Sequence, residues 1–329
     1  MDVFVFGVGR SGTTMMYRLV QQAYLQKFGS DFKSTYEPFI WNRELFNDLY
    51  ENVGSLFGKT ASLSIDGIYH HLSLPLFCGA STGNQLQNNE FFDHFAAQKT
   101  PTKPHVAKLI RANGRMTLFR RLNPSAKFIL MVRNPIDVLN SVKHKFSFFG
   151  DDFYPSDYPR FCRELGDKLI KQPSETTWAT RSAEYVYQMN LAAVEFGIRD
   201  KNTMIVEYDK YKGEPPEIAK NLCDFLGLEF SEAIGRTATT SKGPVTSSVS
   251  LSQSEFEQAL EYGRLHQQMC ENFSLQSPFT TDRIRQRYEG HCTRPDMDTT
   301  YEGLVTNQLR RIILTQKKEL EQLRGCKGA

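Results

Sequence analysis

Long apolar runs and paired cysteines are both missing from this sequence. No segment approaches the roughly 18 consecutive apolar residues that a membrane helix needs. No basic segment or cleavage site precedes the apolar run Val3–Phe6, so we expect a cytoplasmic protein without a membrane span. The six cysteines are widely spread with no CxxC pair, and the seven histidines include one adjacent pair, His70 and His71. Neither a disulfide framework nor a zinc site is indicated, and we expect no metal.

A strong charge imbalance is missing as well, since 40 Lys and Arg residues face 37 Asp and Glu residues and the net charge is +3. This excess is too small for a general nucleic-acid binder, so we expect no nucleic-acid partner, and any anion must be bound in a local basic pocket. With 40% apolar and 23% charged residues, the composition is that of an ordinary soluble globular protein.

What the sequence does contain is a series of short apolar strands that alternate with helical patterns. This alternation predicts an α/β fold with a P-loop-like parallel sheet and helices on both faces. The expected strands are Val3–Phe6, His105–Ile110, Lys127–Val132 and Thr203–Val206, and the expected helices are Thr13–Phe28, Arg115–Leu122, Pro135–Phe146 and Pro216–Leu226.

The expected domain organisation is one α/β domain over residues 1–250 and a helical C-terminal extension over residues 251–329, packed on the same domain. Two insertions, at about 36–100 and 148–178, are candidate walls of an acceptor pocket, because ligands bind outside the carboxyl ends of parallel strands. The Ser/Thr-rich segment 237–254 is expected to be a mobile loop. An apolar stripe from Leu309 to Leu323 indicates docking on the parent domain or, alternatively, a homodimer contact.

A glycine loop, Gly7-Val8-Gly9-Arg10-Ser11-Gly12-Thr13-Thr14, connects the first expected strand to the first expected helix. Successive backbone N–H groups and a helix N-terminus then point at whatever the loop holds, which is typical of an anion site. The glycines match GxGxxG, so an NAD(P)-dependent oxidoreductase is one interpretation, although no apolar strand leads into Asp31, the acidic residue at the appropriate distance. An ATPase is another, but Thr13 stands where its phosphate-binding lysine would be, and the cation is Arg10.

A second anion-binding motif follows the third expected strand. Arg133 stands at the strand end, and Ser141 follows eight residues later in the next helix. Such an Arg and Ser can close on one phosphate, the Arg as a two-pronged donor and the Ser as a neutral donor. The alternative is an Arg that caps the turn and a Ser that faces solvent.

These two motifs together resemble the PAPS-dependent sulfotransferase family. Gly-x-x-Arg-Ser-Gly-Thr-Thr after an N-terminal strand is similar to the family's 5′-phosphosulfate loop, in which an Arg is frequent in the carbohydrate, tyrosylprotein and bacterial members. Arg133-Asn134-Pro135 with Ser141 is similar to its 3′-phosphate motif. The resemblance implies a PAPS donor, a PAP product and no metal. The PAP-binding residues that it implies are Gly9, Arg10, Ser11, Gly12, Thr13, Thr14, Arg133, Ser141, Tyr208 and Lys242.

The resemblance also implies a base for the acceptor and a cation for the leaving group. Arg10 can supply the cation. The Lys-Thr-His strand of many cytosolic members is not matched by Lys108-Leu109-Ile110, whereas Glu37, which precedes Pro38, is similar to the Glu-Pro segments of carbohydrate and protein sulfotransferases. Glu37 is therefore the predicted base, with a surface Glu in a turn as the alternative. Lys108 is a further candidate contact to the transferred group, and His105 is a fallback base.

The expected activity is transfer of the sulfonyl group of PAPS to a hydroxyl or amine of a small-molecule or carbohydrate acceptor. Two alternatives remain open at this point, the NAD(P)-dependent oxidoreductase and a non-catalytic nucleotide- or glycan-binding protein. Binding of PAP in preference to NADPH would exclude the oxidoreductase, and sulfonation of an acceptor would exclude the non-catalytic binding protein.

Overall fold

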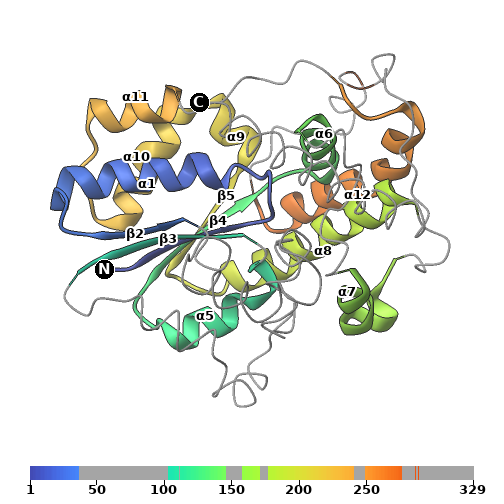
Figure 1. The fold of residues 1–329 in the computed structure, drawn as a ribbon, viewed down its shortest axis with the longest axis horizontal. Helices are drawn as coiled ribbons and strands as arrows, with labels where there is room; N and C mark the ends of the chain where they lie inside the picture. Colours follow the sequence, from blue (N-terminus) through green and yellow to red (C-terminus); the bar gives the residue numbers. More distant parts are fainter. Residues whose placement is uncertain are drawn as a thin grey trace, which may run out of the picture.

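The computed structural model describes residues 1–36, 103–110, 112–145, 158–170, 177–240 and 249–275, together with Gln286 and Tyr288. Strands and helices alternate through these residues, as the sequence predicts (Figure 1). The strands are β1 (Val3–Gly7), β2 (Lys33–Tyr36), β3 (His105–Ile110), β4 (Lys127–Val132) and β5 (Thr203–Glu207). The helices are α1 (Thr13–Phe28), α5 (Met116–Leu122), α6 (Pro135–Lys145), α7 (Tyr158–Leu165), α8 (Trp178–Gly197), α9 (Tyr208–Gly213), α10 (Pro215–Leu226), α11 (Glu232–Thr240) and α12 (Gln253–Asn272), with 3-10 turns at Asn113–Arg115 and Gly166–Lys168.

The five strands form one parallel sheet in the order β2-β3-β1-β4-β5, which confirms the predicted α/β fold. Gly7, the last residue of β1, pairs with Ile110 of β3 and with Met131 of β4, and Val132 pairs with Glu207 of β5. The carboxyl ends of four neighbouring strands therefore lie at one edge of the sheet.

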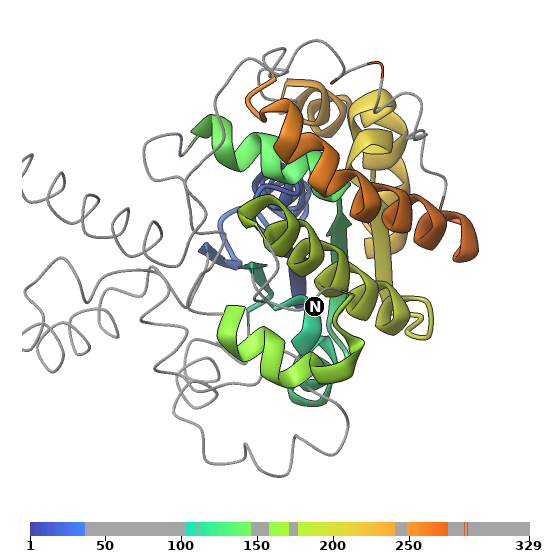
Figure 2. The same cartoon turned by 90° about the vertical axis from the view of Figure 1, so that its right-hand side faces the viewer.

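Helices cover both faces of the sheet (Figure 1). Val3 and Val5 of β1 pack among buried residues of α1, α10 and α11, whereas Phe4 and Phe6 pack on the opposite face with residues of α5, α8 and α12. The alternation of side chains along a strand explains why every residue of β1 is buried. A third cluster joins α6, α8 and α12 beyond the sheet, where Figure 2 shows these three helices together.

The structure corrects the prediction of a mobile loop over the Ser/Thr-rich segment. Residues up to Thr240 belong to α11, and α12 begins at Gln253, so the expected loop over 237–254 is wrong at both ends. The hydroxyls of Thr237, Thr239 and Thr240 donate to backbone carbonyls four residues earlier in α11, which accommodates threonines within a helix.

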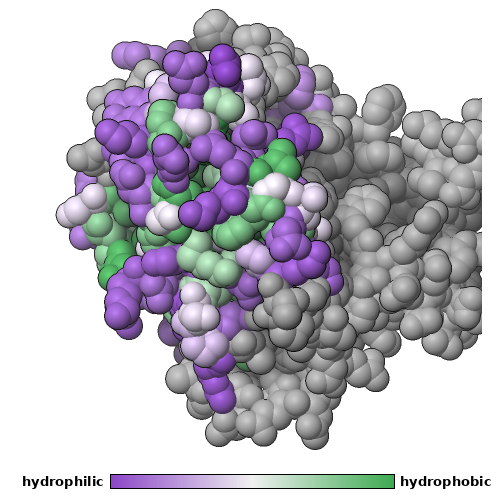
Figure 3. All heavy atoms as spheres, turned by 90° about the vertical axis from the view of Figure 1, so that its left-hand side faces the viewer, coloured by the Kyte–Doolittle hydropathy of each residue, from purple (hydrophilic) through white to green (hydrophobic). Residues whose placement is uncertain are grey.

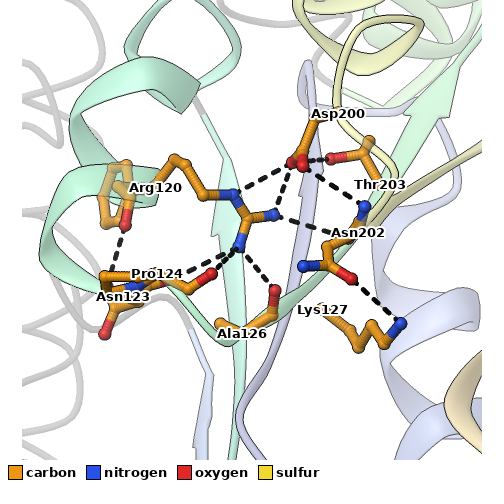
Figure 4. A network of polar contacts seen from close by, with 9 residues as sticks. Arg120, Asn123, Pro124, Ala126, Lys127, Asp200, Asn202 and Thr203 are labelled. Carbon is orange, nitrogen blue, oxygen red and sulfur yellow. Dashed lines mark hydrogen bonds and ion pairs between the residues drawn. The ribbon is translucent and has the colours of Figure 1, made fainter.

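The amino edge of the sheet is held by Arg120 of α5, shown with its partners in Figure 4. Its Nε and Nη2 atoms donate to Oδ2 of Asp200 over 3.0 and 2.5 Å, and its guanidinium lies 3.9 Å from the centre of the Phe128 ring. Nη1 donates to three carbonyls, those of Asn123, Pro124 and Ala126. This network ties α5 to the start of β4 and to the turn before β5.

The side of the molecule that carries α1 and α11 is mostly hydrophilic, with apolar residues scattered among polar ones (Figure 3). No helix within the described ranges has the length and apolar character needed to cross a membrane. The stripe Leu309–Leu323 and the whole of the first predicted insertion after Tyr36 up to residue 100 lie outside the described residues.

Candidate active site

The carboxyl ends of β1 and β4 mark the point where the connections of the sheet diverge. From β1 the chain leads to β2 on one side, and from β4 it leads to β5 on the other. Open parallel sheets bind ligands in the crevice at such a point. The glycine loop follows β1 and Arg133 follows β4, so both predicted anion motifs are placed at this crevice.

The glycine loop turns tightly between β1 and α1. Arg10 has a φ of 67° and Gly12 a φ of 91°, both in the left-handed region. For a residue with a side chain this conformation is strained, and such strain is concentrated at functional sites. A Cβ on Gly7 would lie 2.4 Å from Cγ2 of Thr13, and one on Gly12 would lie 2.4 Å from Cδ2 of Tyr208. The loop therefore requires glycine at both ends.

Some residues of the glycine loop stabilise its turn, and others lie at the N-terminus of α1. Ser11 is buried, and both its N–H and its hydroxyl donate to the Val8 carbonyl, over 3.1 and 2.5 Å. Gly12 caps the N-terminus of α1 without a side-chain acceptor, so a ligand anion meets the start of a helix that begins at Thr13 and Thr14.

Arg133 directly follows β4 at the carboxyl edge of the sheet and is only 6% exposed. Its Nη1 donates to the carbonyl of Arg10 over 2.7 Å, and its guanidinium stacks on the Tyr208 ring with 4.2 Å between the guanidinium carbon and the ring centre. Its Nε is buried and has no hydrogen-bond partner among the described residues. A buried charged donor without an acceptor is costly, by about 1–3 kcal/mol or more, and is a signature of a site that an anionic ligand completes.

Arg10 connects the two motifs directly. Its Nε donates to Oγ of Ser141 over 3.1 Å, although 131 positions separate the two residues in the sequence. Ser141 is 7% exposed and lies two turns into α6. The cation of the first motif and the hydroxyl of the second thus share one location, as a ligand with two anionic groups requires.

Tyr208 begins α9 directly after β5 and is 8% exposed. Its ring is bounded by the Arg133 guanidinium and by Gly12, and Nζ of Lys212 lies 5.5 Å from the ring centre. The structure therefore places Tyr208 beneath Arg133, as a platform for its guanidinium.

Two buried residues that the sequence analysis missed support this arrangement. Asn190 of α8 is fully buried and donates from Nδ2 to the carbonyl of Arg133 over 3.1 Å. Glu207 accepts the N–H of Lys210 over 2.8 Å, which caps α9. Burial, and then the nearby carboxylate of Asp209, raise the pKa of Glu207 to about 8. Asn190 carries no local sequence signal, because it reaches Arg133 from 57 positions away, whereas Glu207 acts locally as the N-cap of α9.

The remaining predicted residues are dispersed. Lys108 is a buried residue of β3, two positions before the carboxyl end of that strand, and pairs with Val5 of β1. His105 begins β3 at the opposite edge of the sheet, where Thr35 Oγ1 lies 2.8 Å from its Nε2 and its ring meets that of Phe4 edge-on. The strand separates His105 from the loop. Glu37 and Lys242 lie outside the described residues.

The sheet order argues against a dinucleotide fold. In that fold the second strand lies beside the first and its terminal acidic residue reaches the ribose. Here β3 lies between β1 and β2. Asp31, the acidic residue expected of that fold, precedes β2 and forms an ion pair with Lys103 over 2.7 Å. Within the described part of the chain, no group of three His, Cys, Asp or Glu side chains is arranged to hold a metal.

Comparison with known proteins finds sulfotransferases among the similar structures. No curated protein matches the chain. Among solved structures, the sulfotransferase domain of the Synechococcus PCC 7002 olefin synthase is 15% identical, with 84% of this chain and 96% of that chain covered and a TM-score of 0.41. A sulfotransferase from Alicyclobacillus acidocaldarius is 14% identical, with 86% and 98% covered and a TM-score of 0.44. A mouse sulfotransferase complexed with PAP is 14% identical, with 88% of each chain covered and a TM-score of 0.41.

The match that decides the family comes from the sequence. A model described as the sulfotransferase family covers residues 2–232, well over half of the 329 residues, and includes the glycine loop, Arg133, Ser141 and Tyr208. The chain is an enzyme that belongs to the sulfotransferase family.

Proposed function

We propose that this enzyme transfers the sulfonyl group of PAPS to a hydroxyl or amine of a small-molecule or carbohydrate acceptor and releases PAP. One observation carries the proposal: Arg133 is buried at the carboxyl edge with Nε unsatisfied, beside a loop whose Arg10 reaches Ser141. A nucleotide that is phosphorylated at both the 3′ and the 5′ position offers the two anions that this pair of motifs can bind.

Membership of the sulfotransferase family excludes the NAD(P)-dependent oxidoreductase interpretation of the glycine loop. The two predicted insertions that would line the acceptor pocket lie mostly outside the described residues.

In the proposed complex each motif has a separate task. The loop from Gly9 to Thr14 holds the 5′-phosphosulfate with backbone N–H groups and the N-terminus of α1. Arg133 and Ser141 hold the 3′-phosphate, the Arg through its unsatisfied Nε and the Ser through its hydroxyl. Arg10 stabilises the negative charge that develops on the oxygen between phosphorus and sulfur.

Glu37 is the proposed base. It follows Tyr36, the last residue of β2, and β2 runs parallel to β1 with one strand between them. Two strand spacings amount to about 10 Å, enough room for the transferred group and the acceptor atom between the end of β2 and the loop. The carboxylate takes the proton of the acceptor hydroxyl or amine as that atom bonds to sulfur, and the sulfur–oxygen bond to PAP breaks. Lys108 remains a further candidate contact to the transferred group, whereas His105 has no place in this proposal.

The donor is tested by calorimetric titration of the purified enzyme with PAP, adenosine 5′-phosphate, NADPH and ATP with Mg²⁺. We expect micromolar binding of PAP and weaker binding of the nucleotide that lacks the 3′-phosphate. Equal affinity for PAP and adenosine 5′-phosphate contradicts the roles of Arg133 and Ser141. Lys242 is included among the proposed PAP-binding residues only through the family resemblance.

The base is tested by the Glu37→Gln variant, assayed with labelled PAPS and a panel of hydroxyl- and amine-bearing acceptors. We expect kcat to fall by about 10²- to 10⁴-fold with PAP affinity nearly unchanged, because proton abstraction is lost and nucleotide binding is not. Glu229→Gln, at an exposed position, is the matched control. Wild-type turnover in Glu37→Gln removes Glu37 from the mechanism, and PAP binding without sulfonation of any acceptor supports a non-catalytic nucleotide-binding protein.

A further inference from the structure

Helix α12 lies beyond the residues matched by the family model, which end at 232. It packs against both α6 and α8 (Figure 2). Helix α6 begins just after Arg133 and carries Ser141, so any element that fixes α6 also fixes the two proposed contacts to the 3′-phosphate.

At the start of α6, Asn134 links the turn to the middle of α12. Its Oδ1 accepts the N–H of Ile136 over 3.0 Å, and its Nδ2 donates to the carbonyl of Gly263 over 3.3 Å. A Cβ on Gly263 would lie 2.6 Å from Cδ1 of Ile136. The two helices therefore approach closely at the turn that follows Arg133, and a side chain at position 263 would press on Ile136 of α6.

Near the end of α6, a buried ion pair links the same two helices. Nζ of Lys143 contacts Oε2 of Glu255, and both side chains are less than 5% exposed. Glu255 also closes the capping box of α12, where its side chain accepts the N–H of Ser252 over 2.8 Å. Between the two ends, Asn140 Oδ1 accepts the N–H of Ser250 over 2.7 Å.

These contacts form a clamp along α6, which we define as Asn134–Gly263, Asn140–Ser250 and Lys143–Glu255. The contacts at both ends hold the axial position of the helix, and Ser141 stands between the last two contacts on a neighbouring face. Buried and hydrogen-bonded pairs of this kind resist sliding, because any shift leaves a buried charge or amide without its partner.

We propose that this clamp sets the separation between Arg133 and Ser141 and thereby determines how strongly the enzyme prefers a 3′-phosphorylated nucleotide. Lys143, Glu255 and Gly263 are positioning residues, since they act through α6 and not on the ligand. The inference rests on the proposed function, because it assigns the 3′-phosphate to Arg133 and Ser141.

The first test is the double variant K143M/E255Q. Met replaces the Lys stem, and Gln retains the capping box, so the ionic link is removed while the shape and the helix cap remain. The measured quantity is the ratio of the calorimetric dissociation constants of adenosine 5′-phosphate and PAP. We expect this ratio to fall by about tenfold relative to the wild type, because displacement of α6 weakens a charged hydrogen bond to the 3′-phosphate. The KM for PAPS rises, and kcat at saturating PAPS is unchanged.

Tyr262→Phe is the matched control, because Tyr262 lies on α12 and the hydroxyl that this variant removes donates to Glu184 of α8 over 3.2 Å. The ratio of the two dissociation constants in Tyr262→Phe should equal that of the wild type, even if thermal unfolding shows that this variant loses as much stability as K143M/E255Q. If the ratio falls equally in both variants, the effect is general loosening and the positioning role is overturned.

A second variant, Gly263→Ala, reaches the same contact without touching the ion pair. The added methyl group presses on Ile136 at the start of α6, and we expect a lower ratio here too. Gly213→Ala is the control, because a Cβ on Gly213 meets no atom within 4 Å, and it should leave the ratio unchanged. A wild-type enzyme that does not prefer PAP contradicts the proposed function itself. A wild-type preference that persists in folded K143M/E255Q or folded Gly263→Ala overturns the clamp.

Discussion

Arg120 and Arg133 are both arginines in the well-packed part of the molecule, at opposite edges of the sheet. At the amino edge, the guanidinium of Arg120 is shared among the carboxylate of Asp200 and several backbone carbonyls (Figure 4). At the carboxyl edge, the guanidinium of Arg133 donates to the carbonyl of Arg10, and its Nε is buried without a partner in the described ranges. The first is complete without a ligand, and the second is not.

The difference separates structural from functional use of the same side chain. Each arginine also lies on an aromatic ring, Phe128 for Arg120 and Tyr208 for Arg133, so stacking does not distinguish them. What distinguishes them is the balance of donors and acceptors: folding supplies the acceptors of Arg120, whereas in the proposed function an anion completes those of Arg133. Substitution of each arginine should therefore affect a different measured quantity.

The largest effect is expected for Arg120→Ala, on stability. Removal of the guanidinium takes away the ionic partner of Asp200, which keeps hydrogen bonds from Thr203 and Asn202, and leaves three carbonyls without this donor. At about 1 kcal/mol for each lost hydrogen bond, we expect the free energy of unfolding to fall by about 3 kcal/mol or more. Denaturant unfolding measures the loss, and PAP affinity of the folded fraction should be nearly unchanged. A large loss of PAP affinity with little loss of stability would erase the distinction between the two edges.

Arg133→Ala should show the reverse pattern. Loss of one charged, hydrogen-bonded contact should weaken PAP binding by about 1.5–3 kcal/mol, while unfolding changes less than in Arg120→Ala because no buried acidic partner is abandoned. Calorimetry with PAP and with adenosine 5′-phosphate provides the measurement, since the second nucleotide should be bound about equally by variant and wild type. An equal loss for both nucleotides would indicate that Arg133 holds the whole loop and not the 3′-phosphate.

The comparison also explains which parts could be predicted from the sequence. The strands β1, β3 and β4 are apolar runs with local signals, and the glycine loop carries its own turn chemistry, so both were predicted at or near their bounds. Strand β2 was missed because Lys33-Ser34-Thr35-Tyr36 is short and polar and becomes a strand by pairing with β3. Arg133 and Ser141 were predicted as a pair because a fixed spacing within one strand and helix encodes them.

The support for these residues could not be predicted in the same way. Asn190 reaches the Arg133 carbonyl from 57 positions away, and Gly263 meets Asn134 from 129 positions away. Single buried amides and glycines have no periodicity or spacing that marks them, and their role follows from tertiary packing alone. The same holds for Arg120, whose acceptors are mostly backbone carbonyls that exist in every sequence.

Glu207 provides a smaller, pH-dependent test at the carboxyl edge. Its pKa of about 8 lies above the ordinary value of 4.5, so the folded state binds the proton more tightly than the unfolded state does. Its contribution to stability is fully present below about pH 4.5 and is lost as the pH rises through 8. Glu207→Gln keeps an acceptor for the N–H of Lys210 and should reduce the decline between pH 6 and 8 by about 2 kcal/mol.

Denaturant unfolding at several pH values measures this decline, and Glu229→Gln, which changes an exposed carboxyl group, is the control. Identical pH profiles for Glu207→Gln and the wild type would mean that the carboxyl is ionised in the folded state throughout this range. Glu207 directly precedes Tyr208, so its titration tests whether Tyr208 is held independently. If packing against Gly12 holds Tyr208, PAP affinity should not change as the Glu207 carboxyl ionises.

The smallest effect is expected for Tyr208→Leu, which removes the ring beneath Arg133 and retains an apolar side chain. An arginine over a tyrosine ring contributes about 0.5–2 kcal/mol, and part of that remains as packing against Leu, so PAP affinity should fall by no more than about tenfold. Adenosine 5′-phosphate affinity should change less, because the ring orients the guanidinium assigned to the 3′-phosphate. If both nucleotides lose affinity equally and by much more, Tyr208 contacts the nucleotide itself, as the family resemblance implies, and the platform beneath Arg133 is only part of its role.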